Sequence, residues 1–169
     1  DLGYFDAEVD YATKENPENG RVAVIFRVKE GQRYKGREQL IEGNHVLTQQ
    51  RLFEDQKLKS GKFFNARFLA QDVTRMKEQY DNLGRLFSVV QPTPRFLEEP
   101  GWVDVVYQVE EDEPRRIGMI NIHIRGDHPH TREDVVRNQI NKFLKPGNLA
   151  SGKDLKMAKA VLQGHHIWD

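Results

Sequence analysis

The sequence has no cysteine, no long apolar run and no excess of charge of either sign. Without cysteine there is no disulfide, no thiol nucleophile and no thiolate metal site. Lys and Arg together number 26, as do Asp and Glu, so no net charge favours a nucleic acid or an anionic membrane surface. No stretch approaches the ~20 apolar residues of a membrane-spanning helix, and no basic and apolar leader opens the chain. We therefore expect neither nucleic acid nor a direct bilayer contact.

The composition is that of a folded protein. Of the 169 residues, 37% are hydrophobic and 31% are charged, which favours a globular chain over a disordered one. This length has room for one ordinary domain or two small ones.

The chain repeats itself at a constant offset. Residues 2–9 (LGYFDAEV) resemble residues 83–90 (LGRLFSVV), and residues 22–31 (VAVIFRVKEG) resemble residues 103–112 (VDVVYQVEED). Each pair is separated by 81 residues, which indicates that one supersecondary unit has been copied. Because the repeat is out of phase with the ends, we expect an excised fragment that starts and stops within a unit.

One complete copy of the unit spans about residues 33–111. Apolar residues at three- and four-residue spacing predict two helices, the first capped by Thr48 and the second capped by Asn65 and ended by Gly84. Alternating apolar residues predict strands on either side of the helices. The expected strands are residues 35–41, 86–91 and 102–110, with a polar connection at 92–101.

This order predicts the fold class, α+β. A strand joined through two antiparallel helices to a later strand lies parallel to it with a right-handed crossover. The last two strands form an antiparallel hairpin. We expect a three-stranded mixed sheet with the final strand in the centre and both helices on one face.

The flanking residues predict incomplete copies. The N-terminal part holds only a closing hairpin. The C-terminal part holds a strand at 117–125, a helix opened by a capping box at Thr131 and a helix capped at Ser151. The expected domains are residues 1–31, 32–112 and 113–169, as half, whole and half repeats.

Short motifs at the boundaries of the units resemble a known family. They are Gly3-Tyr4-Phe5, residues 28–31 (VKEG), residues 41–44 (IEGN), residues 124–127 (IRGD) and residues 144–147 (LKPG). Their order and spacing resemble the POTRA domain, the polypeptide-transport-associated module. The sequence departs from the family pattern at Arg85-Leu86, where the usual aromatic pair is reduced to Phe87, and at residues 164–168, where two histidines intrude.

The resemblance implies a non-enzymatic scaffold without a cofactor. Tandem POTRA arrays are typical of BamA-like outer-membrane assembly factors, in which they precede a β-barrel on the periplasmic side of the bacterial outer membrane. The partners it implies are unfolded outer-membrane protein segments and assembly-complex subunits, and the barrel would supply the only membrane contact. An organellar relative and a POTRA-like domain of an FtsQ-like bacterial division protein stay open as alternatives.

The middle strand of the unit is expected to be an open sheet edge. Its unpaired backbone groups can pair with an added strand of a client, a mode of binding called β-augmentation. The alternative is that a neighbouring repeat covers this edge or that the strand is too short to bind. The predicted edge residues are Leu86, Phe87, Ser88, Val89 and Val90.

The two half repeats are each expected to expose an apolar face. The closing hairpin of one molecule can then complete the opening half of another, and the contact joins two different surfaces. We expect the residues of these self-association faces to be Val22, Val24, Phe26, Val28, Ile120, Ile122 and Ile124.

Histidines provide the one hint of different chemistry. His123, His128 and His130 lie within eight residues and His165 and His166 follow, and imidazole suits zinc or copper. A His-dependent metalloenzyme is therefore the alternative of another class. Because these residues fall in a strand and a proline turn with no sign of convergence, we expect a solvated loop, no metal site and no catalytic residue.

Overall fold

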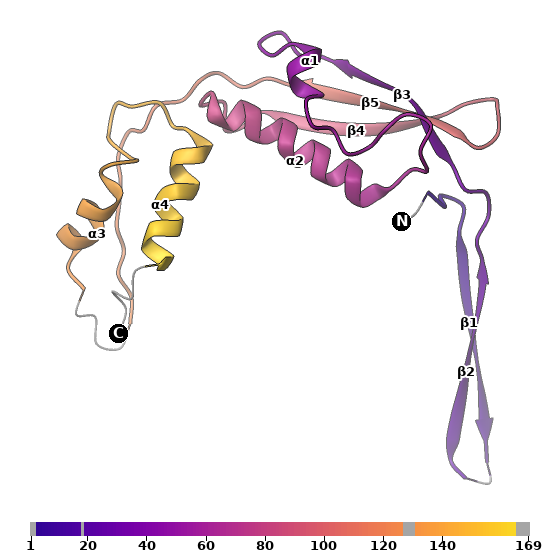
Figure 1. Ribbon diagram of the computed structural model, residues 1–169. Coiled ribbons are helices and arrows are strands. Elements are labelled where there is room, and N and C mark those ends of the chain that lie inside the picture. The colour runs from indigo at the N-terminus through magenta and orange to yellow at the C-terminus, as the bar shows by residue number, and fades with distance from the viewer. Residues whose placement is uncertain (1–2, 18, 127–130, 165–169) are drawn as a thin grey trace. The chain divides into compact units, whose positions relative to one another are not determined.

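A computed structural model describes residues 3–17, 19–126 and 131–164. Strands and helices follow one another as a hairpin, a strand–helix–helix–hairpin unit and a final pair of helices (Figure 1). None of the helices in these residues is long and apolar enough to cross a membrane. The elements are β1 (Glu8–Asn16), β2 (Arg21–Lys29), β3 (Lys35–Glu42), α1 (Gln49–Leu52), α2 (Ala66–Asn82), β4 (Val89–Phe96), β5 (Trp102–Glu110), α3 (Glu133–Ile140) and α4 (Gly152–Gly164).

The strands form two separate sheets. β1 and β2 pair antiparallel from Glu8 opposite Lys29 to Asn16 opposite Arg21. β3, β4 and β5 form a three-stranded sheet in the order β3-β5-β4. The predicted order, with the final strand in the centre, is confirmed.

Contacts divide the chain into two compact units. One unit comprises residues 1–40, 55–72 and 92–107, and it includes the β1–β2 hairpin. The other comprises residues 41–54, 73–91 and 108–169, and it includes α3 and α4. Both units take part of the residues between 32 and 112.

Side-chain caps define the helix starts as the sequence indicates. The Thr48 hydroxyl accepts a hydrogen bond from Arg51 N at 3.3 Å, and the Asn65 amide oxygen accepts one from Arg67 N at 2.9 Å. Ser151 Oγ accepts one from Asp154 N at 3.4 Å. At α3 the N-cap position is taken by Arg132, one residue after the predicted cap Thr131, and the Arg132 side chain makes no cap bond.

The core comes mainly from α2 and β5. Met76 and Tyr80 of α2 are fully buried, as are Val103, Val105 and Tyr107 of β5. These are the positions at which the helical and alternating patterns placed the apolar side chains.

Two expected strands differ from the structure. The predicted strand 86–91 in fact begins at Val89 and continues to Phe96, through the residues expected to be a loop. Residues 117–125 are extended but form no ladder with any strand of the described residues, apart from an isolated bridge between Arg116 and Leu149. An extended segment becomes a sheet strand only when a neighbour pairs with it.

Candidate functional site

β4 is an edge strand with one free side. Among the described strands it pairs only with β5, because the sheet order is β3-β5-β4. Leu97 N donates to the Trp102 carbonyl at 3.4 Å, whereas Lys35 N donates to the Gly101 carbonyl at 2.8 Å. The Trp102 backbone therefore faces β4 and the Gly101 backbone faces β3.

Backbone groups of successive residues in a strand point to alternate sides, and this shows which residues of β4 face its free side. Leu97 faces β5, so residues of odd number in β4 also face β5 and residues of even number point to the open side. The residues on the open side are Val90, Pro92, Pro94 and Phe96.

Two prolines remove hydrogen-bond donors from this edge. Proline has no backbone N–H, and within sheets it is found on edge strands with the missing donor toward solvent. Pro92 and Pro94 occupy such positions, which explains why β4 can run through them. An added strand would find carbonyl acceptors along the whole edge but N–H donors only at Val90 and Phe96.

The expected edge residues Leu86, Phe87 and Ser88 lie in a turn before β4. Ser88 is fully buried, its N donates to the Arg85 carbonyl at 3.2 Å and its Oγ accepts from Asp112 N at 3.0 Å. Only Val89 and Val90 of the expected set are in the strand, with Val89 exposed and Val90 buried. The candidate edge therefore runs from Val89 toward Phe96.

The turn is fixed to the segment that follows β5. Arg115 donates to the Asp112 carboxylate from Nε at 3.2 Å and from a terminal nitrogen at 2.7 Å, and these bonds lower the pKa of Asp112. Arg115 N donates to the Gly84 carbonyl at 2.9 Å, and an Arg85 side-chain nitrogen donates to the Asp112 carbonyl. The apolar patterns of the sequence do not indicate this ionic junction, although its arginines and aspartate lie close together in the sequence.

The backbone hydrogen bond between Arg115 N and the Gly84 carbonyl has a counterpart 81 residues earlier, where different side chains surround it. Tyr34 N donates to the Gly3 carbonyl at 2.8 Å. Here the Phe5 ring lies 4.7 Å from the Phe64 ring and 5.0 Å from the Phe96 ring, measured between centroids. Gly3 has φ of 90°, and a Cβ there would lie 2.9 Å from the Tyr34 carbonyl oxygen. The Gly3-Tyr4-Phe5 motif thus marks a junction held by aromatic rings.

One face of β2 is apolar and exposed. Phe26 is 67% exposed and Val24 is 53% exposed, and Tyr11 of β1 lies opposite Phe26 with 6.3 Å between ring centroids. The predicted residues of this face, Val22, Val24, Phe26 and Val28, are all exposed.

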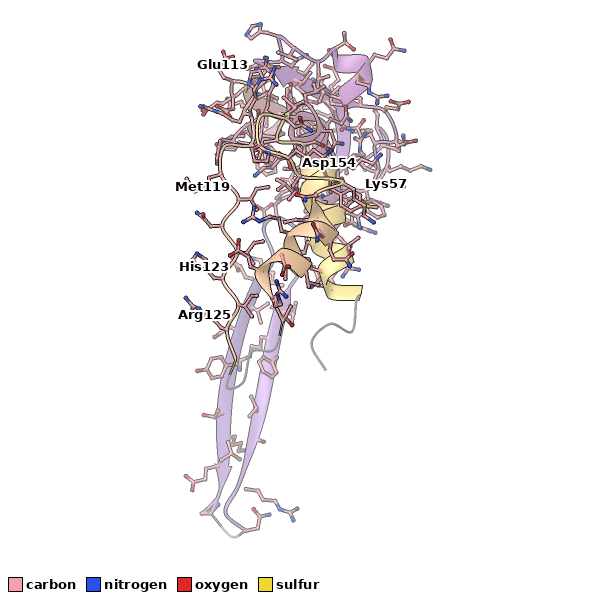
Figure 2. The ribbon with its side chains drawn as sticks, turned by 90° about the vertical axis from the view of Figure 1, so that its left-hand side faces the viewer. Lys57, Glu113, Met119, His123, Arg125 and Asp154 are labelled. Atoms are coloured by element: carbon pink, nitrogen blue, oxygen red, sulfur yellow. The ribbon has the colours of Figure 1, made fainter. Side chains whose placement is uncertain are left out.

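A second apolar surface is a groove between residues 120–125 and the last two helices. Figure 2 shows Met119, His123 and Arg125 along the extended segment, on its side away from α3 and α4. The intervening isoleucines are half-buried. The apolar residues that line the groove are Ile120, Ile122, Ile124, Val136, Ile140 and Leu162.

The half-buried carboxylate of Glu111 has a structural role. Glu111 accepts hydrogen bonds from the backbone N of His45 at 3.0 Å, from that of Val46 at 2.9 Å and from Tyr80 Oη at 2.9 Å. Burial raises the pKa of Glu111, but these hydrogen bonds outweigh burial and the pKa lies below its usual value. Burial and Glu111 together raise the pKa of Tyr80 well above its usual value. The cluster ties three segments of unit 2 together.

The histidine hypothesis gains no support from the described residues. His123 is exposed, and no group of three metal-ligating side chains occurs among residues 3–17, 19–126 and 131–164. His128, His130, His165 and His166 lie outside the described residues.

Comparison with known proteins identifies relatives of this chain. Residues 34–112 match the family model named POTRA, described as "Surface antigen variable number repeat". The outer membrane protein assembly factor BamA of Nitratidesulfovibrio vulgaris is 27% identical over 164 residues, which are 95% of this chain. The aligned part spans only 20% of the length of that relative.

Solved structures share the fold. The crystal structure of Haemophilus influenzae BamA POTRA3-5 matches with a TM-score of 0.77 and 18% identity, covering 99% of this chain and 65% of that chain. BamA from Haemophilus ducreyi lacking POTRA domains 1-3 matches with a TM-score of 0.55 and 24% identity, covering 69% of this chain and 21% of that chain. At these identities the likeness establishes the fold alone.

Proposed function

We propose that this chain, whose residues 34–112 match the POTRA family model, is a periplasmic segment that binds client polypeptides for an outer-membrane β-barrel assembly factor. The relative from Nitratidesulfovibrio vulgaris is named an outer membrane protein assembly factor, and it aligns with 95% of this chain. Under this proposal the chain is a binding scaffold rather than an enzyme. Its partners are unfolded outer-membrane protein segments and subunits of the assembly complex.

The open side of β4 is the observation that carries the proposal. An extended client segment can add to this edge as a fourth strand, with affinity from main-chain hydrogen bonds and loose selectivity from alternate side chains. Such a mode suits many clients because every polypeptide has the same backbone.

The two prolines weaken the pairing of an added strand with this edge. A client strand can donate to carbonyls along β4 but receives donors only from Val90 and Phe96. Prolines on an exposed edge also limit uncontrolled pairing between copies. We infer that the edge holds clients briefly rather than tightly.

The test restores the missing donors. The probe is a synthetic peptide of ten residues with alternating apolar and polar side chains, and binding is followed by NMR shifts of the β4 amides. Pro94→Val restores one N–H on the open side, which is worth about 1 kcal/mol net and therefore roughly fivefold tighter binding.

The matched control is Thr93→Pro, which removes a donor on the side facing β5 and should unfold the hairpin rather than alter peptide affinity selectively. Unchanged affinity in Pro94→Val, with a folded sheet, contradicts backbone pairing at this edge. If the peptide shifts only NMR signals of residues away from β4, backbone pairing at this edge is also contradicted.

A further inference from the structure

The end of α2 lies against the start of α4. Lys153 N donates to Asn82 Oδ1 at 3.0 Å, and Lys156 Nζ donates to a Glu78 carboxylate oxygen at 2.5 Å. All four residues belong to the same compact unit of the chain. Exposed polar bonds therefore join two helices whose contacting residues are more than 70 positions apart in the sequence.

Gly152 allows the two helices to come close. It is the first residue of α4 and is buried, and its φ lies outside the left-handed region, so the backbone conformation does not require glycine there. A Cβ at this position would lie 2.5 Å from Asp81 Cβ, which is closer than such carbons approach in proteins. The glycine is therefore explained by the approach of Asp81.

Asp81 carries a carboxylate oxygen that this contact leaves without a partner. Its Oδ1 is buried and accepts no hydrogen bond among the described residues. The charged groups that face Asp81 are Lys77 and Glu78 on α2 and Lys156 on α4. Burial raises the pKa of Asp81 and Glu78 adds to the rise, whereas the two lysines oppose the rise without cancelling it.

The contact and the ionisation of Asp81 therefore oppose each other. An ionised carboxylate is costly to bury without a donor, and protonation removes most of that cost. When the helices separate, water reaches the carboxyl group and its pKa returns toward the ordinary value, about 3.9. Because the pKa is raised in the contact, the stabilising effect of the proton is complete below that ordinary value and is lost as the pH rises through the raised one.

We propose that Asp81 and Gly152 form a pH-sensitive latch between α2 and α4, which closes when Asp81 takes up a proton and loosens when Asp81 is ionised. The connection beside the latch does not follow the same titration, because hydrogen bonds from Arg115 lower the pKa of Asp112. Mild acidification therefore changes the helix contact and leaves this connection intact. The inference concerns a surface other than the β4 edge and does not depend on client binding there.

The first measurement is the NMR titration of the Asp81 carboxyl carbon in the whole chain. We expect its midpoint to lie above about 3.9 in the wild type. Gly152→Ala pushes the helices apart and admits water, although alanine itself favours the helix, so the midpoint should fall toward the ordinary value. The matched control is Gly164→Ala at the other end of α4, where an added Cβ meets nothing, and it should keep the wild-type midpoint.

Two outcomes of this titration overturn the proposal. One is an ordinary midpoint for Asp81 in the wild type. The other is an equally raised midpoint in Gly152→Ala, which would show that the pKa does not depend on the helix contact.

The second measurement follows the separation of the helices. The chain has no cysteine, so Thr74→Cys and Ala160→Cys, at exposed positions of α2 and α4, can carry the only two spin labels. We expect the distribution of distances between the labels to narrow as the pH falls from neutral through the Asp81 midpoint. Asp81→Asn cannot ionise and should give the narrow distribution at both pH values. A wild-type distribution that does not change with pH, or one that still narrows in Asp81→Asn, overturns the latch.

Glu78→Gln separates the latch from the neighbouring ion pair. Protonation of Glu78 would remove its attraction to Lys156 and loosen the contact at low pH, which is the opposite sign. The narrowing at low pH should therefore persist in Glu78→Gln. Broadening at low pH in the wild type, or loss of the narrowing in Glu78→Gln, would assign the response to the ion pair and contradict the role of Asp81.

Discussion

β2 and β5 are copies of one strand in two different surroundings. Both alternate valines with other residues at the same positions, 81 residues apart. In β5 the residues from Val103 to Tyr107 are buried, whereas every residue of β2 is exposed. The difference lies in what accompanies each strand, since β5 lies in a three-stranded sheet and β2, in the part of the chain that the structure describes, pairs only with β1.

The comparison separates two properties that an alternating pattern combines. The pattern determines which side chains share a face. Whether that face contributes to stability depends on the partner that removes it from water, at about 25 cal/mol per Å² of apolar surface. Substitutions at paired positions of β2 and β5, or in the residues that follow them, therefore distinguish the two properties.

The largest difference is expected for a charge on the apolar face. Val105→Asp buries a carboxylate in the core and should lower the free energy of unfolding by at least about 4 kcal/mol, enough to prevent folding of the central unit. Val24→Asp changes an exposed residue and should shift it by less than about 0.5 kcal/mol in dilute solution. Urea denaturation followed by circular dichroism measures both. Equal effects would show that β2 is buried in solution.

The second pair tests the carboxylates that follow the two strands. Glu111 accepts three hydrogen bonds, and its counterpart Glu30 is exposed. Glu111→Gln should lower the free energy of unfolding by about 2 kcal/mol, because hydrogen bonds to a charged group are lost. Glu30→Gln should leave it within about 0.5 kcal/mol. A wild-type denaturation midpoint in Glu111→Gln would remove the structural role of the cluster.

The same carboxylate predicts a dependence on pH. Because the pKa of Glu111 is lowered in the folded state, its stabilisation is complete above its unfolded pKa, about 4.3. It is lost as the pH falls through the folded pKa. Hydrogen bonds from Arg37 lower the pKa of Asp104 and give it the same sign. Thermal melts between neutral and acid pH should show a smaller drop in Glu111→Gln than in the wild type, and an identical drop would contradict the assignment.

The smallest difference concerns a single hydroxyl. Tyr107→Phe removes the hydrogen bond to Gln39 and should cost about 1 kcal/mol. Phe26→Tyr adds a hydroxyl to an exposed ring and should leave the free energy of unfolding within about 0.5 kcal/mol. Denaturation of both variants under the same conditions gives the comparison. A loss as large in Phe26→Tyr would place Phe26 in a packed core.

The repeat predicts most of the fold because helix caps and apolar alternation both depend on residues close in the sequence. The caps at Thr48 and Asn65 and the alternation in β5 depend on neighbours in sequence, and the structure confirms them. The strand order followed from the crossover rule and is also confirmed. Such features need no knowledge of distant contacts.

The edge was harder to predict because it depends on hydrogen-bond alternation. Pro92 and Pro94 indicated a loop, yet both fit an edge strand whose missing donors point to solvent. The apolar pattern places Ser88 in a strand. In the structure Ser88 is buried in a turn, where its hydroxyl accepts a hydrogen bond from the backbone of Asp112, 24 residues away. Residues 117–125 have a strand pattern, but no strand within 3–17, 19–126 and 131–164 pairs with them. Each difference comes from a partner that the local sequence does not reveal.

Hydrogen exchange of backbone amides in the whole chain tests most directly whether the closing hairpin needs an opening half beside it. In dilute solution we expect β5 amides to exchange only through global unfolding and β2 amides to exchange much faster. Equal protection of β2 and β5 in dilute monomeric protein would contradict the account.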